Sequence, residues 1–235
     1  MIFIRDKLFM ICLPIFGNKL ENILDKLKRA NNLCDIIEIR LDLISDISSV
    51  SLNAIIDNSS LPLIATNRAL WEGGSYKGPE SERVGLLKRA IAAGFQYVDI
   101  EYNSKPELIE DIIEFSKKSG AKIILSYHDF NNTKEPKFYL DLFKGMLSFS
   151  PDIVKIVTMA KYEHDFLSLL PLYIDLKNFD VQLISFCMGE KGRYSRVFCL
   201  KLGAFLSFSC LDEEAASAPG QIPISEFKQI LSLLK

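Results

Sequence analysis

A lysine lies inside the apolar stretch P-D-I-V-K-I-V-T-M, at positions 151–159. Such a run is typical of a strand buried on both faces, where an ammonium group without a partner is costly and tends to lose its proton. A neutral lysine amine attacks carbonyl groups and forms a Schiff base. We therefore expect Lys155 to be buried, unpaired and reactive. The alternative is an edge strand from which its amine reaches water.

One of the two histidines is a candidate proton shuttle. His128 follows the next apolar run upstream, in S-Y-H-D-F, and an imidazole titrates near neutrality. An iminium on Lys155 would acidify the neighbouring carbon, whose proton His128 could take. His164, in K-Y-E-H-D-F, has neighbours that favour an exposed position, and we assign it no role.

Charged side chains also follow the apolar runs that come earlier in the chain. In E-I-R, the two-residue period of a strand puts Glu38 and Arg40 on one face. Arg68 and Glu72 follow the next run, and Asp99 lies in the one after it. A single residue of this kind is more often solvated than functional. Their convergence on one rim of a barrel would indicate a site.

Two later segments add polar groups. M-G-E-K-G-R-Y-S-R, at 188–196, holds Arg193 and Arg196, and either guanidinium could pair with a carboxylate. S-A-P-G-Q, at 217–221, has turn residues, and its Ser217 and Gln221 can bind hydroxyls. With two histidines, scattered carboxylates and no H-E-x-x-H or cysteine pair, we expect neither a metal nor a cofactor.

Eight short apolar runs alternate with helical patterns, which indicates parallel strands joined by right-handed crossovers. We predict a single (β/α)8 TIM barrel over residues 1–235, whose active site lies at the carboxyl ends of the strands. An open doubly wound sheet is the main alternative, weakened by the absence of G-x-G-x-x-G and P-loop motifs. The predicted strands are 8–13, 35–39, 61–66, 97–101, 122–126, 152–157, 181–186 and 204–208.

The clearest helical patterns cover 20–30, 82–94, 106–120 and 139–147. Two of them end in glycine, a common helix stop. The segment 45–60 predicts one poorly patterned helix.

Composition limits the classes of partner. The 235 residues are 49% hydrophobic and 25% charged, as in an ordinary globular protein. A net charge of -2 favours neither nucleic acid nor an anionic membrane, and no segment has the roughly 18 to 20 apolar residues that span a bilayer. Five cysteines without C-x-x-C spacing favour reduced thiols and a cytoplasmic location.

Seven motifs occur in order, each at the end of a predicted strand: E-I-R-L-D, R-A-L-W-E-G-G, Y-V-D-I-E, S-Y-H-D-F, D-I-V-K-I-V, M-G-x-x-G-x-x-S-R and S-A-P-G-Q. Together they resemble the type I 3-dehydroquinate dehydratase family of the shikimate pathway. The resemblance covers nearly the whole chain. It implies a barrel enzyme without a cofactor, a homodimer, that removes water from 3-dehydroquinate to give 3-dehydroshikimate.

The resemblance also implies residue roles. Lys155 would form the imine with the substrate ketone, and His128 would be the general acid and base. Glu72 and Asp99 match positions that orient and tune that histidine.

Further positions match residues that contact the substrate. Glu38, Arg40 and Arg68 are three of them. Arg196, rather than Arg193, matches the partner of the substrate carboxylate. Ser217 and Gln221 match a loop that closes over the ring.

Two other functions remain open at this stage. Another Schiff-base barrel enzyme, such as a class I aldolase, would use the same lysine. A barrel that only binds or assembles would not need His128, Lys155, Arg196 and Gln221 together, and their presence argues against it.

Overall fold

In a computed structural model, which describes residues 9–44, 49–212 and 216–234, eight parallel strands form one sheet in the order β7-β6-β5-β4-β3-β2-β1-β8. Helices alternate with the strands along the chain, so the fold is a TIM-like barrel of one domain, as predicted. The strands are β1 (Ile11–Ile15), β2 (Ile36–Arg40), β3 (Leu63–Thr66), β4 (Tyr97–Glu101), β5 (Lys122–Asp129), β6 (Ile153–Met159), β7 (Gln182–Met188) and β8 (Ser207–Phe208).

The barrel is nearly closed at the seam between its last two strands. β8 pairs in parallel with β1, at Ile11 with Ser207 and Cys12 with Phe208. Toward β7, the described backbone makes one hydrogen bond just before β8, from Phe205 N to Leu183 O at 2.8 Å. In the described part of the chain, β8 is therefore paired as a strand with β1 alone.

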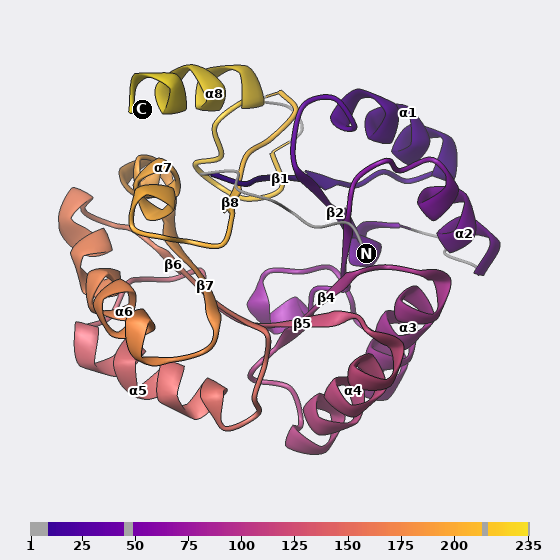
Figure 1. Ribbon diagram of the computed structural model, residues 1–235, viewed down its shortest axis with the longest axis horizontal. Helices are drawn as coiled ribbons and strands as arrows, with labels where there is room; N and C mark the ends of the chain where they lie inside the picture. Colours follow the sequence, from indigo (N-terminus) through magenta and orange to yellow (C-terminus); the bar gives the residue numbers. More distant parts are fainter. Residues whose placement is uncertain (1–8, 45–48, 213–215, 235) are drawn as a thin grey trace.

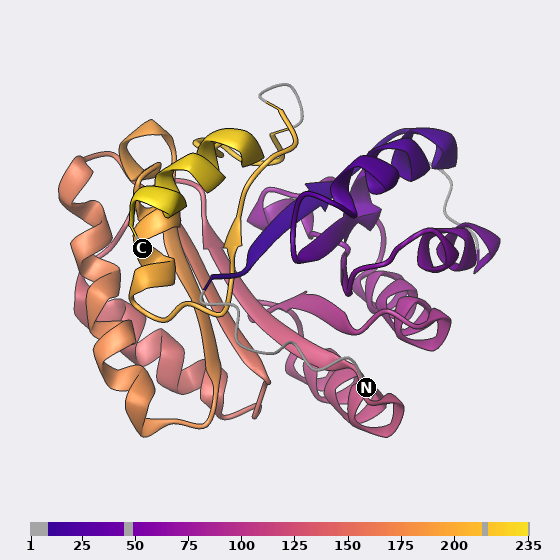
Figure 2. The same ribbon diagram turned by 45° about the horizontal axis from the view of Figure 1, so that its top comes forward.

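The helices form a ring outside the strands (Figures 1 and 2), so the strands are covered by protein and can be apolar on both faces. Gly94 and Gly120 end α3 and α4 with φ angles of 113° and 75°, which confirms the two predicted glycine stops. The helices are α1 (Leu20–Ala30), α2 (Ser49–Asp57), α3 (Glu80–Ala93), α4 (Pro106–Ser119), α5 (Pro136–Leu147), α6 (Leu170–Asp175), α7 (Ser195–Lys201) and α8 (Ile224–Leu233). The 3-10 helices include the single turns η1 (Leu41–Leu43), η2 (Leu70–Glu72), η4 (Leu176–Asn178) and η5 (Glu190–Gly192), and the longer η3 (Glu163–Leu169).

The predicted strands differ from the observed ones most clearly in the first and last strands of the chain and in β5, which continues to Asp129 instead of ending at Ser126. The first begins at Ile11, not Leu8, which lies outside the described residues, and it continues through Pro14. Proline has no N–H to donate, but β8 pairs only with Ile11 and Cys12, so Pro14 lies beyond that ladder. The last strand is limited to the final two residues of 204–208. The helix predicted within 45–60 is α2; residues 45–48 lie outside the described part.

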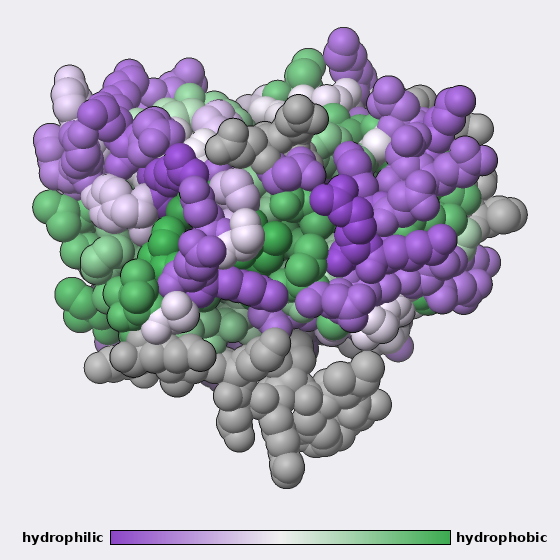
Figure 3. Space-filling model, turned by 90° about the horizontal axis from the view of Figure 1, so that it is seen from above, coloured by the Kyte–Doolittle hydropathy of each residue, from purple (hydrophilic) through white to green (hydrophobic). Residues whose placement is uncertain are grey.

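The outer surface is mostly hydrophilic on the side shown in Figure 3, with smaller groups of hydrophobic side chains between. No helix among the described residues is long and apolar enough to cross a membrane.

Candidate active site

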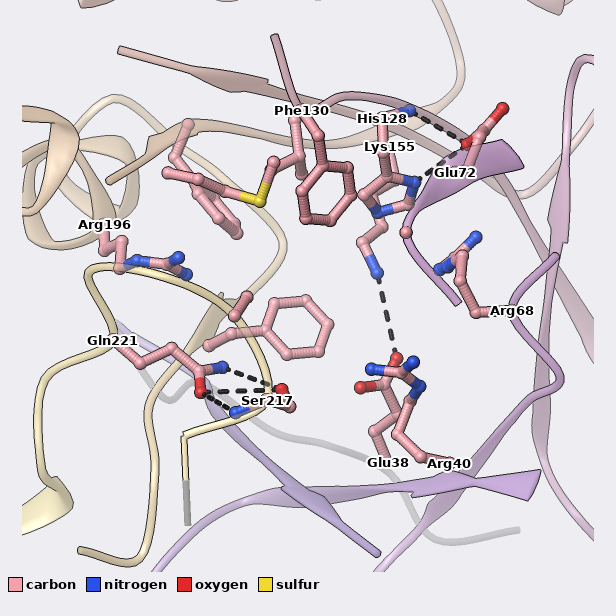
Figure 4. Close-up of a pocket in the computed structure, with 16 residues that line it drawn as sticks. Glu38, Arg40, Arg68, Glu72, His128, Phe130, Lys155, Arg196, Ser217 and Gln221 are labelled. Carbon is pink, nitrogen blue, oxygen red and sulfur yellow. Dashed lines mark hydrogen bonds and ion pairs between the residues drawn. The ribbon is translucent and has the colours of Figure 1, made fainter. Parts of the chain in front are cut away.

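A pocket opens at the carboxyl ends of the strands, where the barrel fold places active sites (Figure 4). It gathers every predicted site residue except Asp99, which lies buried beneath it. The lining residues are Glu38, Arg40, Arg68, Glu72, Gly73, His128, Phe130, Lys155, Val157, Phe186, Met188, Arg196, Phe208, Ser217, Ala218 and Gln221.

Lys155 projects from β6 into the floor of this pocket and is 4% exposed. Its Nζ donates to Asp99 Oδ2 at 2.9 Å, and Glu38 Oε1 lies 3.8 Å away. The ring of Phe208 also faces the amine, 4.4 Å from Nζ to its centroid. The expectation of an unpaired amine is therefore wrong. Two carboxylates and an aromatic face stabilise a cation here, which explains how a lysine is tolerated inside an apolar strand.

Asp99, on β4, is fixed by neutral and charged donors. Ser126 Oγ donates to Oδ1 at 2.6 Å, and Arg68 NH2 donates to Oδ2 at 2.8 Å. Burial alone would raise the pKa of Asp99, but the charges of Arg68 and Lys155 outweigh it and hold this pKa well below its usual range. Its carboxylate bonds Lys155 rather than His128, and it acts on the imidazole only through its charge.

The ion pairs continue behind the pocket. Arg68 NH1 donates to Glu101 Oε1 at 2.7 Å, and the other oxygen of Glu101 accepts from Arg83 on α3. Glu101 and Arg83 are fully buried. Glu101 is the last residue of the predicted strand 97–101. The sequence gave no signal for Arg83, because an arginine in a helical pattern is ordinarily solvated. Positively and negatively charged side chains thus alternate from Arg83 on α3 to Lys155 at the floor of the pocket.

His128 lies within β5 and contacts Glu72 from η2. Glu72 Oε2 accepts the His128 backbone N–H at 2.9 Å and lies 3.0 Å from Nδ1, while Oε1 accepts from Asn103 Nδ2 at 3.0 Å. Burial raises the pKa of Glu72 to about 8. Burial, with the charges of Arg68 and Lys155, lowers the pKa of His128 well below its usual value. The Glu72 carboxyl thus lies within hydrogen-bond distance of both the backbone N–H and the imidazole of His128.

Arg196, on α7, is 1% exposed and lies across the pocket from Arg40 (Figure 4). NH2 donates to Pro219 O at 3.0 Å, and the guanidinium faces the Phe186 ring at 4.6 Å. Burial lowers the pKa of Arg196 to about 10. Within the described part of the chain, no carboxylate pairs with it and its buried Nε has no hydrogen-bond partner. A cation left in this state is a ready site for an anionic ligand.

Arg193, the other arginine of this motif, pairs with Glu190 and Glu226 at the surface. Its charge is directed away from the pocket and is already compensated.

The loop after β8 covers one side of the pocket (Figure 4). Ser217 N donates to Gln221 Oε1 at 2.7 Å, and Gln221 Nε2 donates to Ser217 Oγ at 3.2 Å. Gly189 N, which follows β7, donates to Pro219 O at 3.1 Å. The loop is therefore folded on itself and docked on the β7 rim.

The opposite side is formed by the end of β2. Thr66 Oγ1 donates to Glu38 Oε1 at 2.8 Å, which orients that carboxylate toward Lys155. Arg40 binds Asp42 through two hydrogen bonds, at 2.9 Å from Nε and 2.7 Å from NH2. This side therefore presents hydrogen-bonding groups whose charges have partners.

The sequence did not single out the apolar residues of the pocket. Phe130 is the last residue of the motif S-Y-H-D-F. Its ring packs against Gly73, where a Cβ would lie 2.4 Å from the ring, so the glycine makes room for it. Phe186 and Phe208 looked like ordinary strand residues. No group of three or more potential metal ligands occurs in the residues that the structure describes.

The fold and this pocket define a (β/α)8-barrel protein with a paired lysine and a histidine–carboxyl couple at the catalytic face. A family model described as type I 3-dehydroquinase matches residues 11–235. The chain belongs to the type I 3-dehydroquinase family.

Relatives cover the chain almost completely. It is 34% identical over 228 residues to a 3-dehydroquinate dehydratase from Methanococcus maripaludis, an alignment that spans 96% of this chain and 100% of the relative. It is 34% identical over 219 residues to the bifunctional 3-dehydroquinate dehydratase/shikimate dehydrogenase of Arabidopsis thaliana, covering 92% of this chain and 36% of the plant protein.

A solved structure supports the same family. The type I 3-dehydroquinate dehydratase from Clostridium difficile, with covalently modified comenic acid, superimposes with a TM-score of 0.89 at 28% identity, covering 96% of this chain and 92% of that one.

Proposed function

We propose that this protein removes water from 3-dehydroquinate to give 3-dehydroshikimate, in the shikimate pathway, through a Schiff base on Lys155. The observation that carries the proposal is the buried lysine amine opposite an uncompensated buried Arg196, in a chain of this family. An amine that reacts with a ketone and a guanidinium that pairs with a carboxylate are the two groups that a keto acid requires.

The covalent steps begin at Lys155. The Lys155 ammonium first gives a proton to the neutral imidazole of His128, and the resulting amine attacks the ketone carbon to form a carbinolamine. The imidazolium returns this proton to the carbinolamine oxygen, which leaves as water, so that a protonated imine remains. The protonated imine carries its positive charge on the same nitrogen as the free ammonium, so Asp99 and Glu38 stabilise it as they stabilise the ammonium.

The elimination uses His128. A neutral imidazole with a lowered pKa takes the proton from the carbon beside the imine, and the electron pair moves onto the imine nitrogen to give an enamine. The enamine then expels the β-hydroxyl, which receives the proton from the imidazolium and leaves as water. A second water hydrolyses the conjugated imine, which releases the enone and the free amine of Lys155.

Glu72 positions the histidine for both transfers. Its Oε2 contacts Nδ1 and the backbone N–H of His128, which fixes the ring and leaves Nε2 for the substrate. Asp99 acts on Lys155 directly and on His128 through its charge.

The remaining residues orient the ring. Arg196 takes the carboxylate, since its charge has no protein partner among the described residues. Glu38 and Arg40 on one side, and Ser217 and Gln221 on the other, bind hydroxyls. Arg68 is used mainly by Asp99 and Glu101, so we assign it to holding the floor of the pocket, next to the substrate.

The test is an ultraviolet assay on purified protein with 3-dehydroquinate, because the enone product absorbs where the substrate does not. We expect a rise in absorbance with wild type and a loss of at least about a thousandfold in kcat with Lys155→Ala. Lys137→Ala, on the surface of α5, is the matched control and keeps wild-type turnover. No absorbance change with folded wild type would refute the proposal.

Borohydride trapping separates this reaction from an aldolase. Reduction in the presence of 3-dehydroquinate should attach the reduced ring to Lys155, found by peptide mass spectrometry. Trapping with an aldol substrate but not with 3-dehydroquinate would favour the aldolase.

Two further parts of the proposal come from the family resemblance and the cysteine content. We propose a homodimer in the cytoplasm that binds no nucleic acid or membrane. Size-exclusion chromatography with light scattering tests the dimer, and a mass equal to one 26.6 kDa chain would contradict it.

A further inference from the structure

Asp42 lies directly behind the pocket, on η1, and its side chain is fully buried. It does not line the pocket itself. Its Oδ1 accepts from Arg40 Nε at 2.9 Å and its Oδ2 from Arg40 NH2 at 2.7 Å. This two-point contact fixes both the position and the plane of the guanidinium.

The contact decides what Arg40 can offer to a ligand. Nε and one NH2 hydrogen are occupied, and NH1 forms no hydrogen bond with any residue the structure describes. Arg40 lines the pocket, so NH1 is the group available there. The charge of Arg40 is balanced by Asp42 at 2.7 Å, whereas Arg196 on the opposite side has no such partner.

Asp42 also holds the loop after β3. Its Oδ2 accepts from Ser75 N at 3.0 Å. That loop is folded tightly, with a bridge between Ala69 and Tyr76 and a hydrogen bond from Gly74 N to Ala69 O at 3.0 Å. It carries Glu72, the partner of His128. One carboxylate therefore joins the Arg40 side of the pocket to the loop that orients the histidine.

We propose that Asp42 is a positioning residue that makes Arg40 a donor to ring hydroxyls rather than a second carboxylate site. The inference rests on the proposed function. A guanidinium held edge-on by a carboxylate offers directed donors with little net charge, which suits a neutral hydroxyl. A ligand carboxylate gains more from the uncompensated Arg196. The ring is thereby admitted in one orientation, with the carboxylate at α7 and the hydroxyls at β2.

The experiment measures the affinity of two ligands that lack a ketone, so no turnover is needed. Quinate has a carboxylate and ring hydroxyls, and cyclohexanecarboxylate has the carboxylate alone. For Asp42→Asn we expect quinate to bind about tenfold more weakly, and cyclohexanecarboxylate to bind as tightly as in wild type or more tightly, because the charge of Arg40 is no longer balanced. Asp129→Asn is the control: Asp129 also accepts loop N–H groups at the rim but holds no arginine, so both affinities should stay unchanged.

A double variant separates positioning from general support of the fold. If Asp42 acts through Arg40, Asp42→Asn adds little to the loss that Arg40→Met already causes for quinate. Full additivity, unchanged quinate affinity, or equal weakening of both ligands would each overturn the inference.

Dehydration of 3-dehydroquinate is measured separately from ligand binding. Wild type that binds quinate but does not dehydrate 3-dehydroquinate refutes the proposed function and leaves the ligand comparison for Asp42 decisive. Active wild type with unaltered Asp42→Asn affinities refutes only the role of Asp42.

Discussion

Among the residues that the structure describes, buried charged side chains have partners of opposite charge on one side of the pocket but not on the other. On the side of β2 to β6, each buried charge has a partner: Lys155 with Asp99, Arg68 with Glu101, and Glu101 with Arg83. On the side of β7 and β8, Arg196 is equally buried, yet no described carboxylate pairs with it.

The difference distinguishes charged groups that are stabilised within the fold from a charged group that can be stabilised by a ligand. A paired charge is stabilised by its partner whether or not substrate is present. An unpaired buried cation costs stability until an anion arrives, so its cost is recovered as binding. In the proposed function, the paired side positions the covalent chemistry and the unpaired side binds the substrate carboxylate.

The largest expected effect on stability comes from removing the ion pair farthest from the pocket, between Arg83 and Glu101. Arg83→Met leaves one oxygen of the buried Glu101 without its cation, and we expect unfolding to become easier by about 3 kcal/mol. Chemical denaturation measures this. Arg83 does not line the pocket, so the loss belongs to the fold and not to ligand contact.

Arg196→Met is the matched control, because this arginine is just as buried but has no described anionic partner. We expect its stability to stay within about 1 kcal/mol of wild type or to rise. Equal losses in the two variants would remove the distinction between the two sides.

A smaller effect should follow from lifting the loop that covers Arg196. Gly220 has φ 74°, and a Cβ there would lie 2.3 Å from Gly189 O. Gly120 has φ 75° but nothing within 4 Å. Both alanine variants bear the left-handed backbone cost of about 1 kcal/mol, but only Gly220→Ala displaces the loop. We expect KM to rise roughly tenfold for Gly220→Ala and to stay unchanged for Gly120→Ala. Equal KM values would show that the docked loop does not matter for binding.

The smallest effect concerns the Glu72 and His128 couple that lies between the sides. Because the pKa of Glu72 is raised to about 8, its contribution to stability is full below its unfolded pKa and is lost as pH rises through 8. The lowered pKa of His128 destabilises the fold only below its unfolded value, near 6.5.

Between pH 7 and 9, wild type should therefore lose on the order of 1 kcal/mol more stability than Glu72→Gln. Glu163→Gln, at the exposed Glu163, should keep the wild-type pH profile. Parallel profiles for wild type and Glu72→Gln would contradict the raised pKa.

The pattern of apolar runs was sufficient to predict the barrel and the residues at the carboxyl ends of its strands. Strands buried on both faces read as short continuous runs, and their alternation with helical patterns leaves few topologies. Glu38, Arg68, His128 and Lys155 could be placed at one rim because parallel strands put their carboxyl ends together.

Contacts between strands were not predictable in the same way. Asp99 pairs with Lys155 across 56 positions of sequence, and the expectation of an unpaired lysine was wrong for that reason. Arg83, in a helix, and Asp42, after a strand, carried no signal of burial. Their burial depends on how α3 and the β3 loop pack against the barrel.

What the sequence alone determined is which residues face the catalytic rim, because strand periodicity and parallel order are local properties of the chain. The tertiary structure decided which charges are paired. Pairing depends on distances of a few ångströms between side chains from separate strands and helices, and those distances are fixed only when the barrel closes.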